Sequence, residues 1–375
     1  MRKLDSLQFG RAMSVLSVLV YHITGLSVEY QHGCFYGGWI QALRAGVDVF
    51  FVISGVVMVV TTYSKLEQPG TGKRFIIHRI SRIYPPYLFL TAILTVYWLA
   101  RPNATINSRS GGVDLFTSYT LWPSQHLPLV QVGWSLSYEM MFYLAFFCII
   151  VCVTRTWFPG ALLVWSLAVL AGCAAIALNP SGALITVFPR ASFLFSPFVL
   201  EFVAGCFIGL AFLKVKLGAG RMSVVVATAL FIIEAIIFQA IHYEGAEGLI
   251  ARVVLFGPPA ALLVYGLLAW EEQPGGLHIP RWVIRCGDMS YSIYLVHLLV
   301  IHFAYRYLWP VFDHRGVRPL FMLAAAAVAL ASSVVFYKLV EMPFSLWTRL
   351  HLEEIFRIPG KIVIVQPLGA GEPPG

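Results

Sequence analysis

The stretch "RAMSVLSVLVYH", residues 11–22, has an arginine at one end, a histidine at the other and ten mostly apolar residues between them. It lies in an apolar run, residues 8–27, that is long enough to cross a membrane as a helix, which needs about 20 such residues. At about 100° and 1.5 Å per residue, the eleven steps from Arg11 to His22 make three turns plus about 20°. Both side chains therefore share one helix face and lie about 16 Å apart along the axis.

Similar apolar runs recur along nearly the whole chain. Its 375 residues are 59% hydrophobic and only 12% charged, with a mean hydropathy of +0.78, which excludes an ordinary soluble domain. The sequence predicts an all-α, polytopic integral membrane protein of about ten transmembrane helices. The expected spans are 8–27, 45–62, 84–100, 134–153, 160–178, 194–213, 222–241, 249–270, 289–308 and 319–340.

The distribution of Lys and Arg predicts the orientation of these spans, because short cytoplasmic loops carry the excess of basic residues. The basic connection 63–84 belongs on the cytoplasmic side together with the N-terminus, and an even number of spans returns the C-terminus to the cytoplasm. We expect a transmembrane domain over residues 1–345. Residues 346–375 are expected to form a cytoplasmic interfacial helix and then a disordered, Pro/Gly-rich tail from Pro359.

Composition also excludes several kinds of function. The net charge of +8 is mostly a topology signal, with no basic patch interleaved with aromatic residues, so nucleic-acid binding is not expected. No small-residue cleavage site follows the first apolar run, which is therefore expected to stay as a span. Of the six cysteines only Cys34 is expected to face outward, and neither CxxC nor HExxH occurs, so we expect no disulfide framework and no metal.

Ionisable residues inside spans are costly and mark candidate functional sites. Asp48 and Glu139 lie near the starts of spans that enter from the outer side, so they are expected at a depth similar to that of His22. Glu201 enters the sixth span from the same side. A histidine beside a carboxylate can act as a general base, because the acid fixes its tautomer and stabilises the imidazolium.

The cytoplasmic side offers a complementary group of cations. Arg79 and Arg82 are three residues apart and would share a face of a helix, forming a clamp of two guanidinium groups for phosphates. Arg11 ends its helix on the same side. A donor with a phosphorylated head and a long arm that ends in an acyl group would fit this arrangement, and acyl-coenzyme A has that shape.

Each of these residues also has a structural interpretation. A histidine in a span, such as His22, more often hydrogen-bonds another helix, and the arginine pair is placed as ordinary positive-inside anchors would be. Asp48 can cap its helix, where a carboxylate is favoured. Of His297 and His302, at least one is expected to be structural. Glu139 is harder to explain in this way, because it should lie below the interface.

Six sequence blocks, taken in order, resemble the acyltransferase-3 family of polytopic membrane acyltransferases. The resemblance covers about residues 4–345, and the L-Q opening is most similar to the exopolysaccharide O-acetyltransferase branch. The blocks are "LQFGRAMSVLSVLVYH", "GVDVFFVISG", "HRISRIYPPY", "WSLSYEMMFY", "YSIYLVH" and "VEMPF".

This resemblance implies a multi-pass enzyme of the inner (plasma) membrane. It would transfer an acyl group, usually acetyl, from cytoplasmic acyl-CoA to a hydroxyl of a cell-surface or exopolysaccharide sugar or of its lipid-linked precursor. His22 would be the essential base with Arg11 as its partner, while Arg79 and Arg82 would contribute to CoA binding. Glu139 would be the acid of the fourth-span block. Expected partners are the acceptor saccharide, membrane lipids and polysaccharide-assembly proteins.

The sequence departs from the family pattern at one position and leaves other functions open. His78 precedes Arg79 where many relatives have consecutive arginines, which would weaken a phosphate clamp. We do not expect the fused hydrolase domain that some relatives carry, so a second acyl-relay step would need another protein. Some relatives acylate macrolides or other small molecules, and no motif excludes this. A glycan transporter or flippase would also place charges inside spans, but it predicts paired half-helices or internal repeats, and neither is visible.

Overall fold

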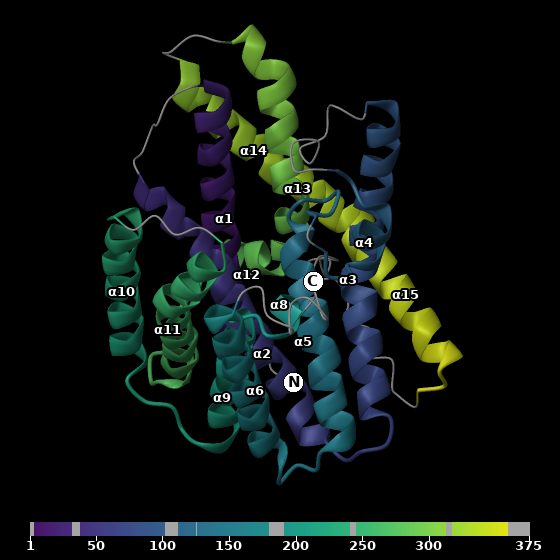
Figure 1. Cartoon of the computed structure of the whole chain (residues 1–375), viewed down its shortest axis with the longest axis vertical. Helices are drawn as coiled ribbons and strands as arrows, with labels where there is room; N and C mark the ends of the chain where they lie inside the picture. Colours follow the sequence, from purple (N-terminus) through teal and green to yellow (C-terminus); the bar gives the residue numbers. More distant parts are fainter. Residues whose placement is uncertain are drawn as a thin grey trace, which may run out of the picture.

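The structure is a computed structural model of the whole chain. It describes residues 4–31, 38–101, 112–124, 126–179, 191–240, 245–312 and 317–358. Within these ranges all regular secondary structure is helical (Figure 1), which confirms the predicted all-α class. The predicted tail from Pro359 and the expected outward-facing Cys34 lie outside the described residues.

Long helices make up most of the bundle, and short ones connect them. The long helices are α1 (Asp5–Gln31), α2 (Gly46–Thr62), α3 (Thr71–Ala100), α5 (Gly133–Cys152), α6 (Phe158–Leu178), α9 (Phe198–Lys214), α10 (Gly220–Ala240), α11 (Gly245–Glu272), α13 (Ser290–Phe303), α14 (Arg318–Phe336) and α15 (Met342–Ile355). The short elements include η1 (Gly38–Ala45), α4 (Leu115–Thr120), α8 (Ala191–Leu194) and α12 (Arg281–Asp288).

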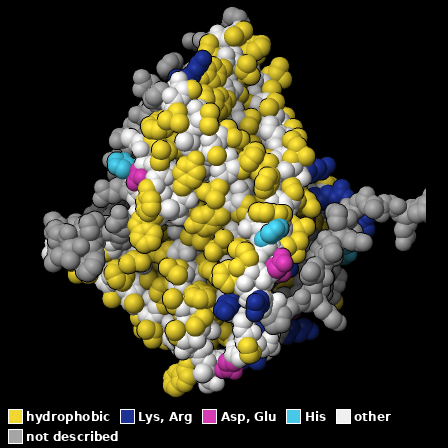
Figure 2. All heavy atoms as spheres, turned by 90° about the vertical axis from the view of Figure 1, so that its right-hand side faces the viewer, with side chains coloured by type: hydrophobic (Ala, Val, Ile, Leu, Met, Phe, Trp, Pro, Cys, Tyr) yellow, Lys and Arg dark blue, Asp and Glu magenta, His cyan; other side chains and the backbone are white. Residues whose placement is uncertain are grey.

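The described part of the chain contains nine helices long and apolar enough to cross a membrane. The number becomes ten when α12 and the helical segment Ser290–Val311, which meet at 71°, are taken as one broken span. Figure 2 shows a broad surface of hydrophobic side chains on one side of the molecule, as expected for contact with lipid. The prediction of a polytopic membrane protein with about ten spans is confirmed, and the orientation of the termini stays a prediction.

Helix α3 is longer than the predicted span, because it begins at Thr71 and continues through Pro85 and Pro86. The basic segment before residue 84 is therefore helical and continuous with the span. Arg79 and Arg82 consequently sit on a helix, as their shared-face prediction requires, two to three turns after its start.

Helices α14 and α15 also form one continuous helix, Arg318–Ile355, which contains a π-helical segment at Tyr337–Glu341. Figure 1 shows this rod running diagonally across the bundle. Its 38 residues correspond to about 57 Å, well beyond the roughly 30 Å of the hydrocarbon core. The expected boundary between residues 345 and 346 thus falls inside a single helix, whose last turns pack on α3, where Glu353 bonds His78 at 2.8 Å.

Helix α2 lies at the centre of the bundle and packs against α1, α9 and α11. Its contact with α9 is a backbone-to-backbone one: a Cβ placed on Gly55 would overlap the carbonyl oxygen of Phe202, and one on Gly205 would overlap that of Val52. Small residues allow such close approach between membrane helices. The polar residues of α2 therefore face protein and not lipid.

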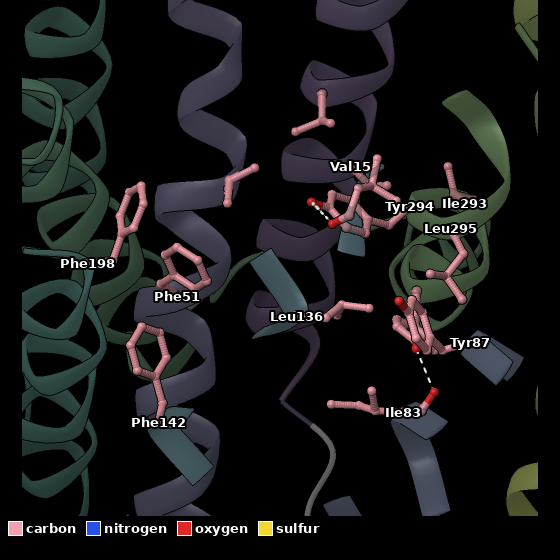
Figure 3. Packing of buried hydrophobic residues seen from close by; sticks show 14 of the residues in the cluster. Val15, Phe51, Ile83, Tyr87, Leu136, Phe142, Phe198, Ile293, Tyr294 and Leu295 are labelled. Carbon is pink, nitrogen blue, oxygen red and sulfur yellow. Dashed lines mark hydrogen bonds between the residues drawn. The ribbon is translucent and has the colours of Figure 1, made fainter. Parts of the chain in front are cut away.

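Aromatic side chains connect α2 to its neighbours. The ring of Phe51 packs against Phe142 of α5 and Phe198 of α9, with ring centroids 5.2 and 5.1 Å apart (Figure 3). These tilted and edge-on contacts are the favourable arrangements for aromatic pairs. They hold α5 and α9 against α2, which lines both cavities described next.

Candidate active site

Three arginines and one glutamate that the sequence predicts as site residues line the same cavity, which we call the arginine cavity. It lies between α1, α2, α3, α5 and α13. Its polar lining residues are Arg11, Ser54, Arg79, Arg82, Ser135, Glu139, Tyr143, Ser290, Tyr291 and Tyr294. The structure therefore brings Arg11 of the first span together with the Arg79–Arg82 pair, as expected.

Arg79 is the most enclosed of these arginines, with 9% of its surface exposed. Its guanidinium lies 5.7 Å from the ring centroids of both Phe75 and Tyr143. Its Nε is buried and has no hydrogen-bond partner in the described part of the chain. Because an unsatisfied buried donor costs about 1–3 kcal/mol, this nitrogen is well suited to an anionic ligand.

Glu139 faces the arginine cavity from α5. Its Oε1 accepts a hydrogen bond from Ser54 Oγ of α2 at 2.7 Å and another from the hydroxyl of Tyr143, one turn further along. It also interacts electrostatically with Arg11 and Arg79. The structure thus groups Glu139 with the arginines, while His22 lines a different cavity, because depth in the membrane does not determine which way a helix faces.

His22 lines the second cavity, which we call the histidine cavity. The lining includes Tyr21, His22, Arg44, Val47, Gln131, Trp134, Arg252, Tyr294 and Leu298. Nδ1 of His22 lies 3.0 Å from Nε2 of His297 in α13, and the ring centroids are 5.1 Å apart. No hydrogen bond joins His22 to Asp48 or Glu139 within the described ranges, so its direct polar neighbour is a second histidine.

Asp48 is fully buried and pairs with Arg252 of α11. Nη2 of Arg252 donates to Oδ2 at 2.6 Å and Nε donates to Oδ1 at 3.2 Å. The guanidinium lies 5.8 Å from the ring of Trp134 and 5.1 Å from that of Phe198. Asp48 therefore holds a cation in the wall of the histidine cavity.

Glu201 belongs to the same group, because it interacts electrostatically with both Asp48 and Arg252. It is almost completely buried in α9. Of the two carboxylates with which Glu201 was expected to group, the structure places Asp48 beside it, while Glu139 lines the arginine cavity.

The arginine and histidine cavities share two wall residues, Val47 of α2 and Tyr294 of α13. Figure 3 shows Tyr294 reaching from α13 toward α1. Its hydroxyl lies 2.7 Å from Ser135 Oγ and donates to the carbonyl of Val132 at 3.2 Å, which holds the ring in place. Val47 and Tyr294 thus form a partition between the two cavities. Arg11 and His22, which both belong to α1, line the cavities on its two sides.

Sequence reasoning did not place Arg252, His297 or Tyr294 in the site. Arg252 lies within the predicted eighth span, so the rule that marks charged residues inside spans would have found it. His297 was visible as a histidine in a span, but its pairing with His22 depends on the packing of α1 against α13. Tyr294 carried no signal, because tyrosine is common in such helices.

The described residues contain no group of three or more His, Cys, Asp or Glu side chains placed to hold a metal ion. Their fold and cavities define a class: a multi-pass membrane protein with a cationic cavity and a histidine-containing cavity enclosed by its helices.

Comparison with known proteins shows the family. A family model described as an acyltransferase domain, the acyltransferase-3 family, matches residues 4–338, so the chain belongs to this family and is a multi-pass membrane acyltransferase. The exopolysaccharide production protein ExoZ of Rhizobium meliloti (strain 1021) is 34% identical over 268 residues, which are 68% of this chain and 76% of that protein.

A second relative is similar over a shorter region. The O-acetyltransferase OatA of Staphylococcus aureus (strain NCTC 8325 / PS 47) is 27% identical over 165 residues, which are 39% of this chain and 24% of that protein. No solved structure matches the chain.

Proposed function

We propose that the protein is an O-acetyltransferase of the inner (plasma) membrane. It transfers an acetyl group from cytoplasmic acetyl-CoA to a hydroxyl of an exopolysaccharide or cell-surface sugar, or of its lipid-linked precursor. The similarity to an exopolysaccharide production protein and to an O-acetyltransferase supports the acceptor and the acyl group. The observation that carries the proposal is the partition formed by Val47 and Tyr294, with Arg11, Arg79 and Arg82 on one side and His22 on the other.

The arginine cavity is the proposed donor site. Arg11, Arg79 and Arg82 bind the phosphates of acetyl-CoA, because guanidinium groups form paired, charge-assisted hydrogen bonds with phosphate oxygens. The unpartnered Nε of Arg79 supports this role. Glu139 acts here by orienting the guanidinium groups around the donor.

The histidine cavity is the proposed acceptor site. Nε2 of His22 takes the proton of the acceptor hydroxyl while the oxygen attacks the thioester carbonyl. The carbon–sulfur bond then breaks, and the departing CoA sulfur takes the proton from His22, which returns to its neutral form. Asp48 acts through Arg252, whose positive charge lies in the wall of this cavity.

The test is transfer of label by membranes that contain the protein, incubated with radiolabelled acetyl-CoA and an extracted polysaccharide fraction. We expect label in the polysaccharide with the wild type and none above background with His22→Ala. His351→Ala is the matched control, because this histidine is exposed at the end of α15. Absence of transfer by the wild type, or full transfer by His22→Ala, would refute the proposal.

A further inference from the structure

The two histidines form a chain of hydrogen bonds that ends on a backbone carbonyl. His297 is fully buried, with its Nδ1 2.8 Å from the carbonyl oxygen of Ile293 and its Nε2 3.0 Å from Nδ1 of His22. His22 is only partly buried, and besides His297 it hydrogen-bonds the backbone of Val18, one turn earlier in α1.

The chemistry of these contacts determines which nitrogen carries each proton. A carbonyl oxygen can only accept, so Nδ1 of His297 must carry a hydrogen. In a neutral imidazole the other nitrogen is then an acceptor, so Nε2 of His297 must receive a hydrogen from Nδ1 of His22. Neutral His22 is therefore left with a lone pair on Nε2, the nitrogen that does not face His297.

We propose that His297 is a positioning residue that holds His22 in the Nδ1–H tautomer and so directs the basic Nε2 toward the acceptor hydroxyl. This inference rests on the proposed function, because it assigns His22 the role of base. His297 itself touches neither substrate, since its side chain is fully buried and it lines neither cavity.

His297 also acts after the proton has moved. When Nε2 of His22 takes the hydroxyl proton, the ring becomes an imidazolium and its Nδ1–H bond to His297 becomes charge-assisted, which strengthens it about twofold. In many enzymes a carboxylate accepts this Nδ1–H hydrogen bond from the catalytic histidine. Here Asp48 is engaged by Arg252 and Glu139 by Ser54 and Tyr143, so a neutral histidine takes that place.

Two substitutions of His297 distinguish the effect of its hydrogen-bond acceptor from the effect of its side-chain volume. His297→Leu removes the acceptor, and we expect kcat to fall about 100-fold or more, as is typical when general-base catalysis is lost, with the KM for acetyl-CoA unchanged. His297→Gln offers an amide oxygen to Nδ1 of His22, and we expect its kcat to exceed that of His297→Leu at least tenfold. Equal kcat values for the two variants, in proteins that elute identically on size exclusion, would overturn the proposal.

The tautomer can be observed without any substrate. In protein labelled with ¹⁵N-histidine and placed in lipid nanodiscs, NMR distinguishes protonated from bare ring nitrogens, and His22→Gln identifies the signals of His22. We expect a protonated Nδ1 and a bare Nε2 in the wild type, and loss of this preference in His297→Leu. A protonated Nε2 on neutral His22 in the wild type, or an unchanged spectrum in His297→Leu, would overturn the proposal.

The NMR result and the transfer assay can contradict the role of His297 and the proposed function independently of each other. If the wild-type enzyme transfers no acetyl group, the radiolabel assay shows it while the NMR spectrum still reports the tautomer. If transfer depends on His22 but the spectrum shows a protonated Nε2, the enzyme assignment holds and the role of His297 is refuted.

Discussion

The carboxylate of Asp48 in α2 is held by the guanidinium of Arg252 in α11, 204 residues further along the chain, through hydrogen bonds from both Nε and Nη2. Both groups are buried, with 0% and 7% of their surfaces exposed. The pair connects the central helix to a helix on its flank and sets the charge of the histidine cavity.

Removal of one member of this pair should destabilise the protein strongly. Asp48→Asn leaves the buried Arg252 charge without its hydrogen-bonded carboxylate, and breaking a buried pair in this way typically costs about 3–5 kcal/mol. We expect a lower thermal unfolding midpoint in detergent, and the double variant Asp48→Asn/Arg252→Gln should recover part of the loss. Strictly additive effects of the two single substitutions would show that the pair is not coupled.

Arg79→Ala should weaken donor binding more than it slows the chemical step. Hydrogen bonds to charged groups contribute about 1.5–3 kcal/mol, so the KM for acetyl-CoA should rise roughly 10- to 100-fold. Steady-state kinetics with purified enzyme would measure this. Lys73→Ala is the matched control, because Lys73 is an exposed cation on the same helix. A similar rise in both variants would indicate only a general loss of positive charge.

Gly55→Ala should destabilise the contact between α2 and α9. Its Cβ would overlap the backbone of Phe202, and overpacking of this kind typically costs about 1–3 kcal/mol. Gly25→Ala is the control, because Gly25 also lies inside a helix but has nothing within 4 Å of an added Cβ. We expect a lower unfolding midpoint for the first variant and an equal or higher one for the second. Equal midpoints for the two would contradict the close approach.

The predicted cytoplasmic location of the C-terminus can be tested with reporters. Green fluorescent protein fused after Gly375 should fluoresce, while alkaline phosphatase at the same place should be inactive, because it folds only outside the cytoplasm. The physical basis is the excess of basic residues on segments such as 63–84. The opposite pair of results would invert the topology. The arginine cavity, which is the proposed donor site, would then lie on the outer side of the membrane.

The sequence predicts the helices well because lipid imposes a simple rule: each span must be apolar and long enough to cross. The same rule singles out Arg11, His22 and the Arg79–Arg82 pair, and Arg79 and Arg82, three residues apart on α3, line the same cavity. Apolarity and spacing act along one helix at a time, so they do not depend on how helices pack.

Rotation and continuity of helices were harder to predict. Glu139 lies with the arginines and Asp48 with Arg252, because the facing of each helix depends on contacts such as that between Gly55 and Gly205. Pro343 would normally end a helix, but the π-helical turn directly before it lets the chain continue. The facing of the helices depends on neighbours distant in sequence, whereas the continuity of this helix depends on a local irregularity that the apolar pattern does not reveal.

The long helix from Arg318 to Ile355 extends from the neighbourhood of the arginine cavity to the molecular surface. Glu341, at the end of its π-helical turn, bonds Ser292 and interacts electrostatically with Arg11 and Arg82. Twelve residues and about 18 Å further on, Glu353 bonds His78. One continuous helix therefore connects the carboxylate of Glu341, which interacts with two arginines of the arginine cavity, to the pair formed by Glu353 and His78.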